Sequence, residues 1–155
     1  MRNVSEQLFT FSGEGSKASS AKLSHERCSA KALGLPEKWL RDAIFQVPEI
    51  VIGPCRAAEL TDDDWYPLAK EFRTAAGKID VLLVSTEGRL AVIETKLAAN
   101  RENRRKVLAQ ALDYLSHLAD AIEKVAPMLP RVNDELVADP DDIRDKLAQG
   151  DVLVI

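Results

Sequence analysis

Two apolar runs joined by a short polar turn constrain the fold of this chain more than any other feature. The runs cover residues 79–84 and 90–93, are rich in β-branched side chains, and flank a turn that contains Gly88. Such runs favour strands, and a glycine that can adopt a positive φ favours a tight turn. The stretch of residues 77–96 therefore predicts an antiparallel hairpin.

The register of this hairpin brings two acidic side chains together. With a loop of residues 86–88, Ser85 faces Arg89 and Asp80 faces Glu94, and the Cβ atoms of opposed residues are about 5 Å apart. Like charges in opposed positions repel, and a carboxylate taken out of water without a partner is costly or takes up a proton. We therefore expect a positive charge between the two carboxylates.

Two sources of positive charge suit this position. Lys96 lies two residues after Glu94 and hence on the same face of the strand. A hard divalent cation such as Mg²⁺, which favours one or two carboxylates plus water molecules, would supply the rest. A structural alternative stays open, in which Glu94 and Lys96 form a solvated salt bridge of little worth and Asp80 merely ends its strand.

The pattern of the first apolar run argues against full exposure. Its apolar residues fall on both faces of the predicted strand, which indicates that both faces are buried. Alternation predicts Ile79, Val81 and Leu83 on one face and Leu82 and Val84 on the other.

The order of these motifs resembles a known nuclease superfamily. Gly-Lys-Ile-Asp at 77–80, then a strand, a turn and Glu-Thr-Lys at 94–96, is similar to the PD-(D/E)xK superfamily. The Arg-rich segment and Gln-x-x-x-Tyr helix that follow resemble a group of uncharacterised prokaryotic members, and the likeness extends over residues 8–122. It implies an α/β restriction-endonuclease-like core, with a mixed central sheet flanked by helices in the order α-β-β-β-α-β.

The resemblance implies a metal site of four residues. Asp80 and Glu94 would hold Mg²⁺, or Mn²⁺ as a substitute, with the carbonyl of Thr95 and with Glu37. Glu37 begins a helix predicted for residues 36–47 from its first-position proline and its apolar spacing of three and four residues. As an alternative, Glu37 is a first-turn acid favoured by the helix dipole.

The resemblance also implies a catalytic role for three further residues. Lys96 would orient or deprotonate the attacking water, and Gln110 would lie beside it, with Tyr114 in support. Gln110 and Tyr114 are four residues apart and share one face of a long amphipathic helix predicted for residues 101–124. The alternative is an interfacial Gln and a core Tyr. Arg73, on a strand predicted at 69–73, either lies near the site or pairs with Glu71.

Basic residues are concentrated where this helix begins. The net charge of −4 argues against a general nucleic-acid coat protein, because affinity for phosphate backbones comes from clustered Lys and Arg. A local basic cluster beside a metal site nevertheless suits the binding of flanking phosphates without sequence readout. The cluster consists of Arg101, Arg104, Arg105 and Lys106.

The remaining segments suggest one domain. Residues 1–24 are predicted to be largely flexible with one short strand, and residues 25–155 to be a single nuclease-like domain. Residues 140–149 predict a helix capped by Asp139, followed by a buried strand parallel to the second hairpin strand. Because the resembled proteins continue beyond this strand, the chain is expected to be truncated at its C-terminal end.

These patterns predict a metal-dependent endonuclease that hydrolyses phosphodiester bonds, with DNA favoured over RNA as its partner and a homodimer allowed. The alternative is a non-catalytic nucleic-acid or protein binding module that retains the fold. A third class is a structural protein whose acids are surface pairs. With 46% hydrophobic and 30% charged residues, no membrane-length apolar stretch and no secretory signal pattern, we expect a cytoplasmic protein without membrane contact.

Overall fold

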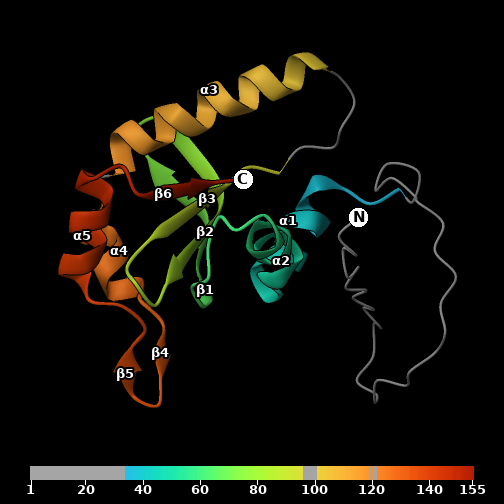
Figure 1. The fold of residues 1–155 in the computed structure, drawn as a ribbon. Helices are drawn as coiled ribbons and strands as arrows, with labels where there is room; N and C mark the ends of the chain where they lie inside the picture. Colours follow the sequence, from blue (N-terminus) through green and yellow to red (C-terminus); the bar gives the residue numbers. More distant parts are fainter. Residues whose placement is uncertain (1–33, 96–100, 119, 121) are drawn as a thin grey trace, which may run out of the picture.

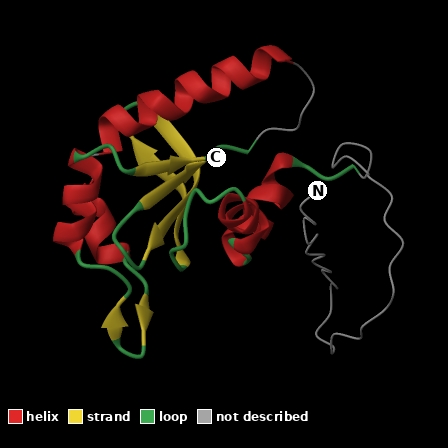
Figure 2. Ribbon diagram, in the orientation of Figure 1, coloured by secondary structure: helices red, strands yellow, loops and turns green. Residues whose placement is uncertain are grey.

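A four-stranded mixed sheet organises the chain (Figures 1 and 2). The computed structural model describes residues 34–95 and 101–155 except 119 and 121, and within α3 it leaves the side chains of 101–108 and 111 undescribed. The strand order is β1-β2-β3-β6, with antiparallel pairs β1–β2 and β2–β3 and the parallel pair β3–β6. The strands are β1 (Trp65–Thr74), β2 (Gly77–Ser85), β3 (Leu90–Ile93) and β6 (Val152–Val154).

Helices cover both faces of this sheet (Figure 2). One face is covered by α1 (Glu37–Gln46) and α2 (Glu49–Ala57). The other is covered by α3 (Arg101–Leu118), α4 (Ile122–Val125) and α5 (Pro140–Ala148). The described residues thus form a mixed α/β fold, and the prediction that the last strand lies parallel to the second hairpin strand is confirmed.

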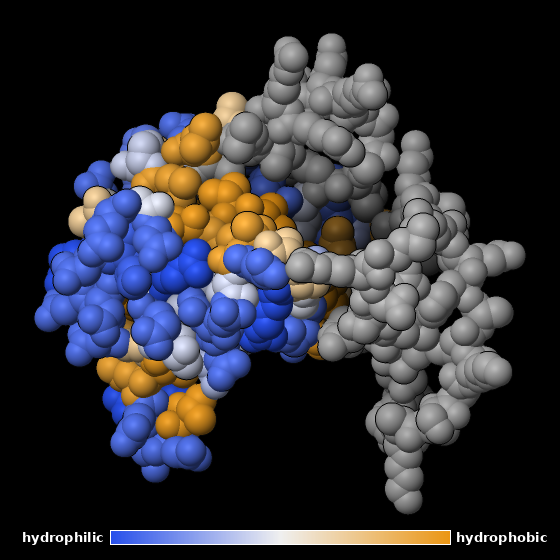
Figure 3. All heavy atoms as spheres, viewed as in Figure 1, coloured by the Kyte–Doolittle hydropathy of each residue, from blue (hydrophilic) through white to orange (hydrophobic). Residues whose placement is uncertain are grey.

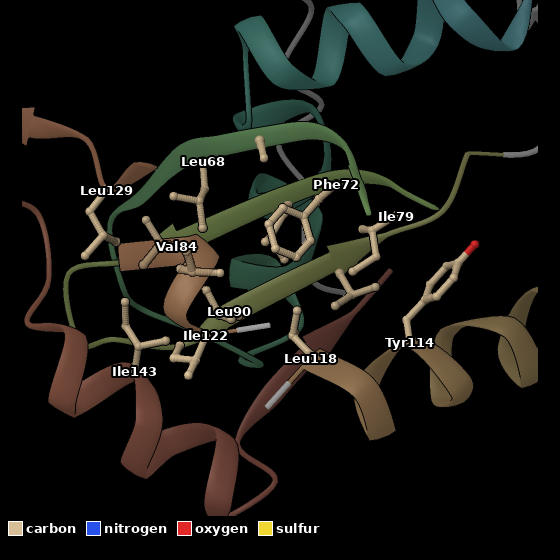
Figure 4. Packing of buried hydrophobic residues seen from close by; sticks show 14 of the residues in the cluster. Leu68, Phe72, Ile79, Val84, Leu90, Tyr114, Leu118, Ile122, Leu129 and Ile143 are labelled. Atoms are coloured by element: carbon tan, nitrogen blue, oxygen red, sulfur yellow. The ribbon is translucent and has the colours of Figure 1, made fainter. Parts of the chain in front are cut away.

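Burial on both sheet faces is confirmed, and the alternation of side chains explains it. Leu82 and Val84 pack towards α3, whereas Val81 and Leu83 pack towards α1 and α2. All four side chains are fully buried. Figure 4 shows the cluster on the α3 side, where the Tyr114 ring lies at one end of the cluster.

The prediction that Ile79 shares a face with Val81 and Leu83 is wrong. Ile79 belongs to the cluster on the α3 side, together with Leu82 and Val84. The opposite strand is irregular at this point, because Glu71 has a φ of 52° between the pairs Lys70–Val81 and Phe72–Ile79. The period of two that governs a regular strand therefore fails between Ile79 and Val81.

The turn of the β2–β3 hairpin has the predicted form. The amide of Ser85 donates to the carbonyl of Arg89 at 2.8 Å, and Gly88 has a φ of 78°. The Ser85 hydroxyl oxygen accepts hydrogen bonds from the amides of Glu87 and Arg89. A Cβ on Gly88 would lie 2.9 Å from the Cβ of Asp142 in α5, so this turn has room for glycine alone.

Two segments differ from the prediction. No helix was predicted for residues 49–57, but they form α2, which buries Ile52 and contains Pro54. The helix predicted for residues 101–124 is not continuous, because α3 ends at Leu118 and α4 follows.

The segment between α4 and α5 forms a small hairpin that was not predicted. It consists of β4 (Arg131–Val132) and β5 (Glu135–Leu136), after a 3₁₀ turn at Ala126–Met128. Val132 and Leu136 of this hairpin are exposed, and Figure 3 shows apolar surface at the lower left, where Figure 1 labels β4 and β5.

The helix that follows was predicted correctly, and the Asp139 carboxylate caps it by accepting from the Asp141 amide at 2.8 Å. Among the described residues, no helix has the length and apolarity needed to span a membrane. Residues 1–24, for which a flexible segment was predicted, lie outside the described part of the chain.

Candidate functional site

The two acids of the predicted site lie at the end of the hairpin opposite its turn. The last pair of the β2–β3 ladder is Val81–Ile93, and Asp80 and Glu94 are the residues that adjoin this pair on the two chain segments. The Glu94 amide donates to the carbonyl of Ile155 at 3.0 Å, which extends the pairing with the β6 segment. Glu94 is 8% exposed, so its carboxylate is held largely out of water.

Asp80 is oriented by the residue that follows Glu94. One of its carboxylate oxygens, Oδ2, accepts hydrogen bonds from the Thr95 amide at 2.9 Å and from the Thr95 hydroxyl at 2.7 Å. Thr95 is itself buried. The resemblance implied a metal-binding role for the Thr95 carbonyl, which stays a prediction; the structure shows that the Thr95 amide and hydroxyl fix the direction of the Asp80 side chain.

Arg41 is the residue of this site that the sequence interpretation missed. It lies on α1, its side chain is 17% exposed, and its Nη1 atom is 3.6 Å from the second Asp80 oxygen, Oδ1. The same Nη1 lies 3.0 Å from Oε1 of Glu71 on β1. The signal was helical spacing, since Arg41 stands four residues after Glu37 and so shares its helix face.

Glu71 reaches Arg41 because of its unusual backbone. Its neighbour Lys70 already faces α1, with Nζ 2.7 Å from the Asp42 carboxylate and 5.3 Å from the centre of the Phe45 ring. Successive residues of a regular strand point to opposite faces, so two in a row cannot both face α1. The left-handed φ of 52° at Glu71 breaks this alternation and brings both side chains to the helix.

Glu71 also binds a second cation. Its Oε1 accepts a hydrogen bond from Nζ of Lys78 at 2.9 Å. This hydrogen bond, together with the charges of Arg41 and Lys78, lowers the pKa of Glu71 below its ordinary value. A chain of alternating charges therefore runs from Lys78 through Glu71 and Arg41 to Asp80.

The Gln-Tyr pair of α3 lies at the start of β2. The Gln110 amide donates to the Tyr114 hydroxyl, and Tyr114 is 2% exposed. Its ring carbon Cε1 lies 3.2 Å from where a Cβ on Gly77 would stand, and the φ of Gly77 is 144°. Figure 4 shows the Tyr114 hydroxyl directed away from the apolar cluster. The Gln110–Tyr114 pair thus anchors α3 beside Gly77, which follows the β1–β2 turn and precedes Asp80 by three residues.

For the other predicted residues that it describes, the structure gives the element on which they lie rather than a contact with Asp80. Glu37 is exposed in the first turn of α1, one helical turn before Arg41. Arg73 is exposed on β1 and pairs in register with Lys78, where both line a hollow beside the β1–β2 turn. Lys96 lies outside the described residues. The first two turns of α3 contain the basic cluster Arg101, Arg104, Arg105 and Lys106, whose side chains are likewise outside the description.

The donor set at Asp80 and Glu94 fits a hard cation and lacks the ligands of a soft one. Among residues 34–95 and the described part of 101–155, no three His, Cys, Asp or Glu side chains are grouped for a metal ion. Two carboxylates with main-chain oxygens and water are nevertheless the ligands that Mg²⁺ uses. Asp80 Oδ1 suits such a role, because its contact with Arg41 at 3.6 Å is longer than a hydrogen bond.

Comparison of the chain with family models, with curated proteins and with solved structures found no match. The functional proposal therefore rests on the arrangement of residues described above and on the sequence motifs.

Proposed function

We propose that this protein is a divalent-metal-dependent nuclease that hydrolyses phosphodiester bonds, with DNA as the favoured substrate. The observation that carries the proposal is that Asp80 and Glu94 directly follow the last β2–β3 pair, Val81–Ile93, at the open end of the hairpin, where Thr95 holds the Asp80 carboxylate. Two carboxylates in opposed positions repel each other, and nothing in a purely structural hairpin requires them. A binding site for a cation gives a reason for both.

The order of elements supports the same proposal. A helix, three antiparallel strands, a helix and a strand parallel to the third follow one another, with α2, α4, the small hairpin and α5 as additions. With these additions left out, the order matches the α-β-β-β-α-β order that the resemblance to the PD-(D/E)xK superfamily implies. Since one fold hosts many functions, the acids argue for the activity more strongly than the topology does.

Hydrolysis of a phosphodiester needs an activated water, neutralisation of the growing phosphate charge and stabilisation of the leaving oxygen. A bound Mg²⁺ supplies Lewis acidity for these needs. Asp80 and Glu94 would hold that ion, and the two Thr95 hydrogen bonds would keep Asp80 in position. Lys96 would orient the attacking water or take its proton.

The elements around this centre provide for the nucleic acid. The first turns of α3 carry the four basic residues 101, 104, 105 and 106, which would hold flanking phosphates. Gln110 and Tyr114 fix the same helix beside the β1–β2 turn. Residues 94–100 thus connect β3, which ends beside Glu94, to the first turns of α3, which contain the basic residues.

A second candidate function has one observation in its favour. Arg41 already places a positive charge 3.6 Å from Asp80. In a protein without a metal ion, this guanidinium could take the place of the cation. Such a protein would bind nucleic acid or another protein without cleaving it. The two candidates differ in whether a divalent ion binds at Asp80 and Glu94.

Cleavage of labelled single-stranded, duplex and branched DNA and RNA in Mg²⁺ or Mn²⁺ tests the proposal. We expect cleavage by the wild type, and a loss of at least about 100-fold in Asp80→Ala and in Lys96→Ala, the scale on which acid–base and electrostatic groups act. Asp42→Asn is the matched control, because Asp42 pairs with Lys70 on the same pair of elements, α1 and β1.

Each outcome separates the two candidates. Loss in both variants with retention in Asp42→Asn would support the nuclease. A folded wild type that cleaves nothing in either metal, while retaining affinity for DNA or RNA, would favour the binding module instead. Equal cleavage by all four proteins would indicate a contaminating nuclease and would refute the assignment of Asp80 and Lys96.

A further inference from the structure

We propose that Glu71 is a positioning residue that holds Arg41 away from Asp80, so that Asp80 Oδ1 stays available for a divalent cation. This inference rests on the proposed function and extends it by two residues on α1 and β1. Two carboxylates, those of Glu71 and Asp80, share one nitrogen of Arg41. Nη1 is 3.0 Å from Glu71 and 3.6 Å from Asp80, so Glu71 holds the guanidinium more closely.

The two oxygens of Asp80 are in different situations. Oδ2 accepts two hydrogen bonds from Thr95, at 2.9 and 2.7 Å. Oδ1 has only the 3.6 Å ion pair with Arg41 among the described contacts. A direct bond between a guanidinium and a carboxylate is about 2.7–2.9 Å long. Arg41 thus stays outside bonding distance of the oxygen that a metal ion would use.

Without Glu71, Arg41 would not remain where it is. Its Nε atom is buried and makes no hydrogen bond, so the guanidinium already has an unmet donor. Removing the Glu71 charge would leave a largely buried cation with Asp80 as its nearest carboxylate, and a buried charge that loses its partner is strongly unfavourable. The side chain would gain most by closing onto Oδ1.

The backbone of Glu71 gives independent support. A non-glycine residue with a φ of 52° costs on the order of 1 kcal/mol or more, and such strain persists where the surroundings impose it. Here the strain turns Glu71 towards α1 although Lys70 before it already faces that helix. A regular β1 would direct Glu71 away from α1 and leave Arg41 to Asp80. The conformational strain at Glu71 is therefore linked to the separation of Arg41 from Asp80.

Calorimetric titration of the full chain with Mn²⁺ alone, without nucleic acid, tests this role. We expect Glu71→Gln to raise the Kd for Mn²⁺ by about tenfold, the change that corresponds to ~1.4 kcal/mol. Arg41→Met should lower the Kd, since it removes the competing cation. In the double variant the Kd should equal that of Arg41→Met, because Glu71 acts only through Arg41.

Two variants control for charge and for folding. Asp42→Asn also removes one negative charge from the α1–β1 face, where Asp42 pairs with Lys70, and should leave the Kd within about twofold. Glu71→Gly relieves the positive φ and should fold at least as well as wild type while losing Mn²⁺ affinity like Glu71→Gln.

The outcomes distinguish this inference from the proposed function. If wild type binds Mn²⁺ and Glu71→Gln binds it equally well, the positioning role is refuted while the metal site stands. The role is also refuted if Glu71→Gln weakens binding to the same extent when Arg41 is Met. If neither the wild type nor any variant binds Mn²⁺, the metal-dependent function is refuted, and the positioning role is refuted with it.

Discussion

The two ends of the β2–β3 hairpin are built from the same strands but in opposite ways. At the turn end, the Ser85 hydroxyl accepts from two amides, and Arg89 binds Asp151 at 2.8 Å and lies over the Trp65 ring. At the open end, Asp80 and Glu94 follow the last pair of the ladder, and the Arg41 guanidinium lies 3.6 Å from Asp80. The turn end binds its acid, Asp151, directly, whereas at the open end the closest cation of Asp80 stays 3.6 Å away because it pairs more closely with Glu71.

This difference separates stability from function along a single hairpin. Closely paired and hydrogen-bonded groups stabilise the native state, whereas opposed carboxylates and a left-handed glutamate cost free energy there. Proteins retain such costs mainly where binding or chemistry needs them. We therefore expect substitutions at the turn end to change stability, and substitutions at the open end to change ligand binding.

The largest change in stability is expected from Gly88→Ala. The new Cβ would meet Asp142 at 2.9 Å and the α5 backbone at 3.0 Å, at a residue whose φ is 78°. Left-handed strain and overpacking together should lower the free energy of unfolding by roughly 2–4 kcal/mol. Urea unfolding measures it.

Gly150→Ala is the matched control for that substitution. Gly150 also has a positive φ, of 71°, but a Cβ there would meet nothing within 4 Å. We expect Gly150→Ala to cost only the strain of a left-handed backbone, about 1 kcal/mol. Equal losses at the two glycines would show that contact with α5 contributes nothing, and the turn end would then be less tightly built than we describe.

A smaller change is expected at Asp151. Burial raises the pKa of this carboxyl, but the Lys146 hydrogen bond and the charges of Arg89 and Lys146 outweigh it, so the net pKa lies below 3.8. Since the folded pKa is lowered, the stabilisation is complete above the unfolded pKa and disappears as the pH falls through the folded value. Asp151→Asn should cost about 0.5–1 kcal/mol at neutral pH, as partly exposed pairs do.

The pH dependence of this difference is the measurement. The gap between wild type and Asp151→Asn should be constant down to about pH 5 and should close below the ordinary carboxyl pKa. Asp145→Asn, an exposed acid on α5, serves as the control and should show no gap. A gap that widens in acid would contradict the ion-pair assignment.

The hairpin and its register were predictable because they depend on local patterns. Gly88 and the two apolar runs specify the turn, and the turn then specifies the observed pairs from Val84–Leu90 to Val81–Ile93. The Asp139 cap is equally local. The parallel placement of β6 followed from the handedness and reach of a β-α-β crossover.

The environment of Asp80 was not predictable in this way. Arg41 is 39 residues before Asp80, and it meets Glu71 only because β1 breaks its alternation. Nothing in the identity of Glu71 indicates a positive φ, which a glutamate rarely adopts. The same irregularity explains why Ile79 was assigned to the wrong face, since a period of two assumes regular strands on both sides.

The stability of Glu94→Gln with and without Mn²⁺ tests most directly the claim that the open end is a cation site. Without metal, we expect the variant to be as stable as wild type or more stable, because it removes one of two opposed charges. With Mn²⁺ at about 100 times its Kd, wild type should gain roughly 2.7 kcal/mol of unfolding free energy and the variant should gain little. A variant that is less stable without metal, beside a wild type that Mn²⁺ does not stabilise, would show that the acids are structural and would contradict the account.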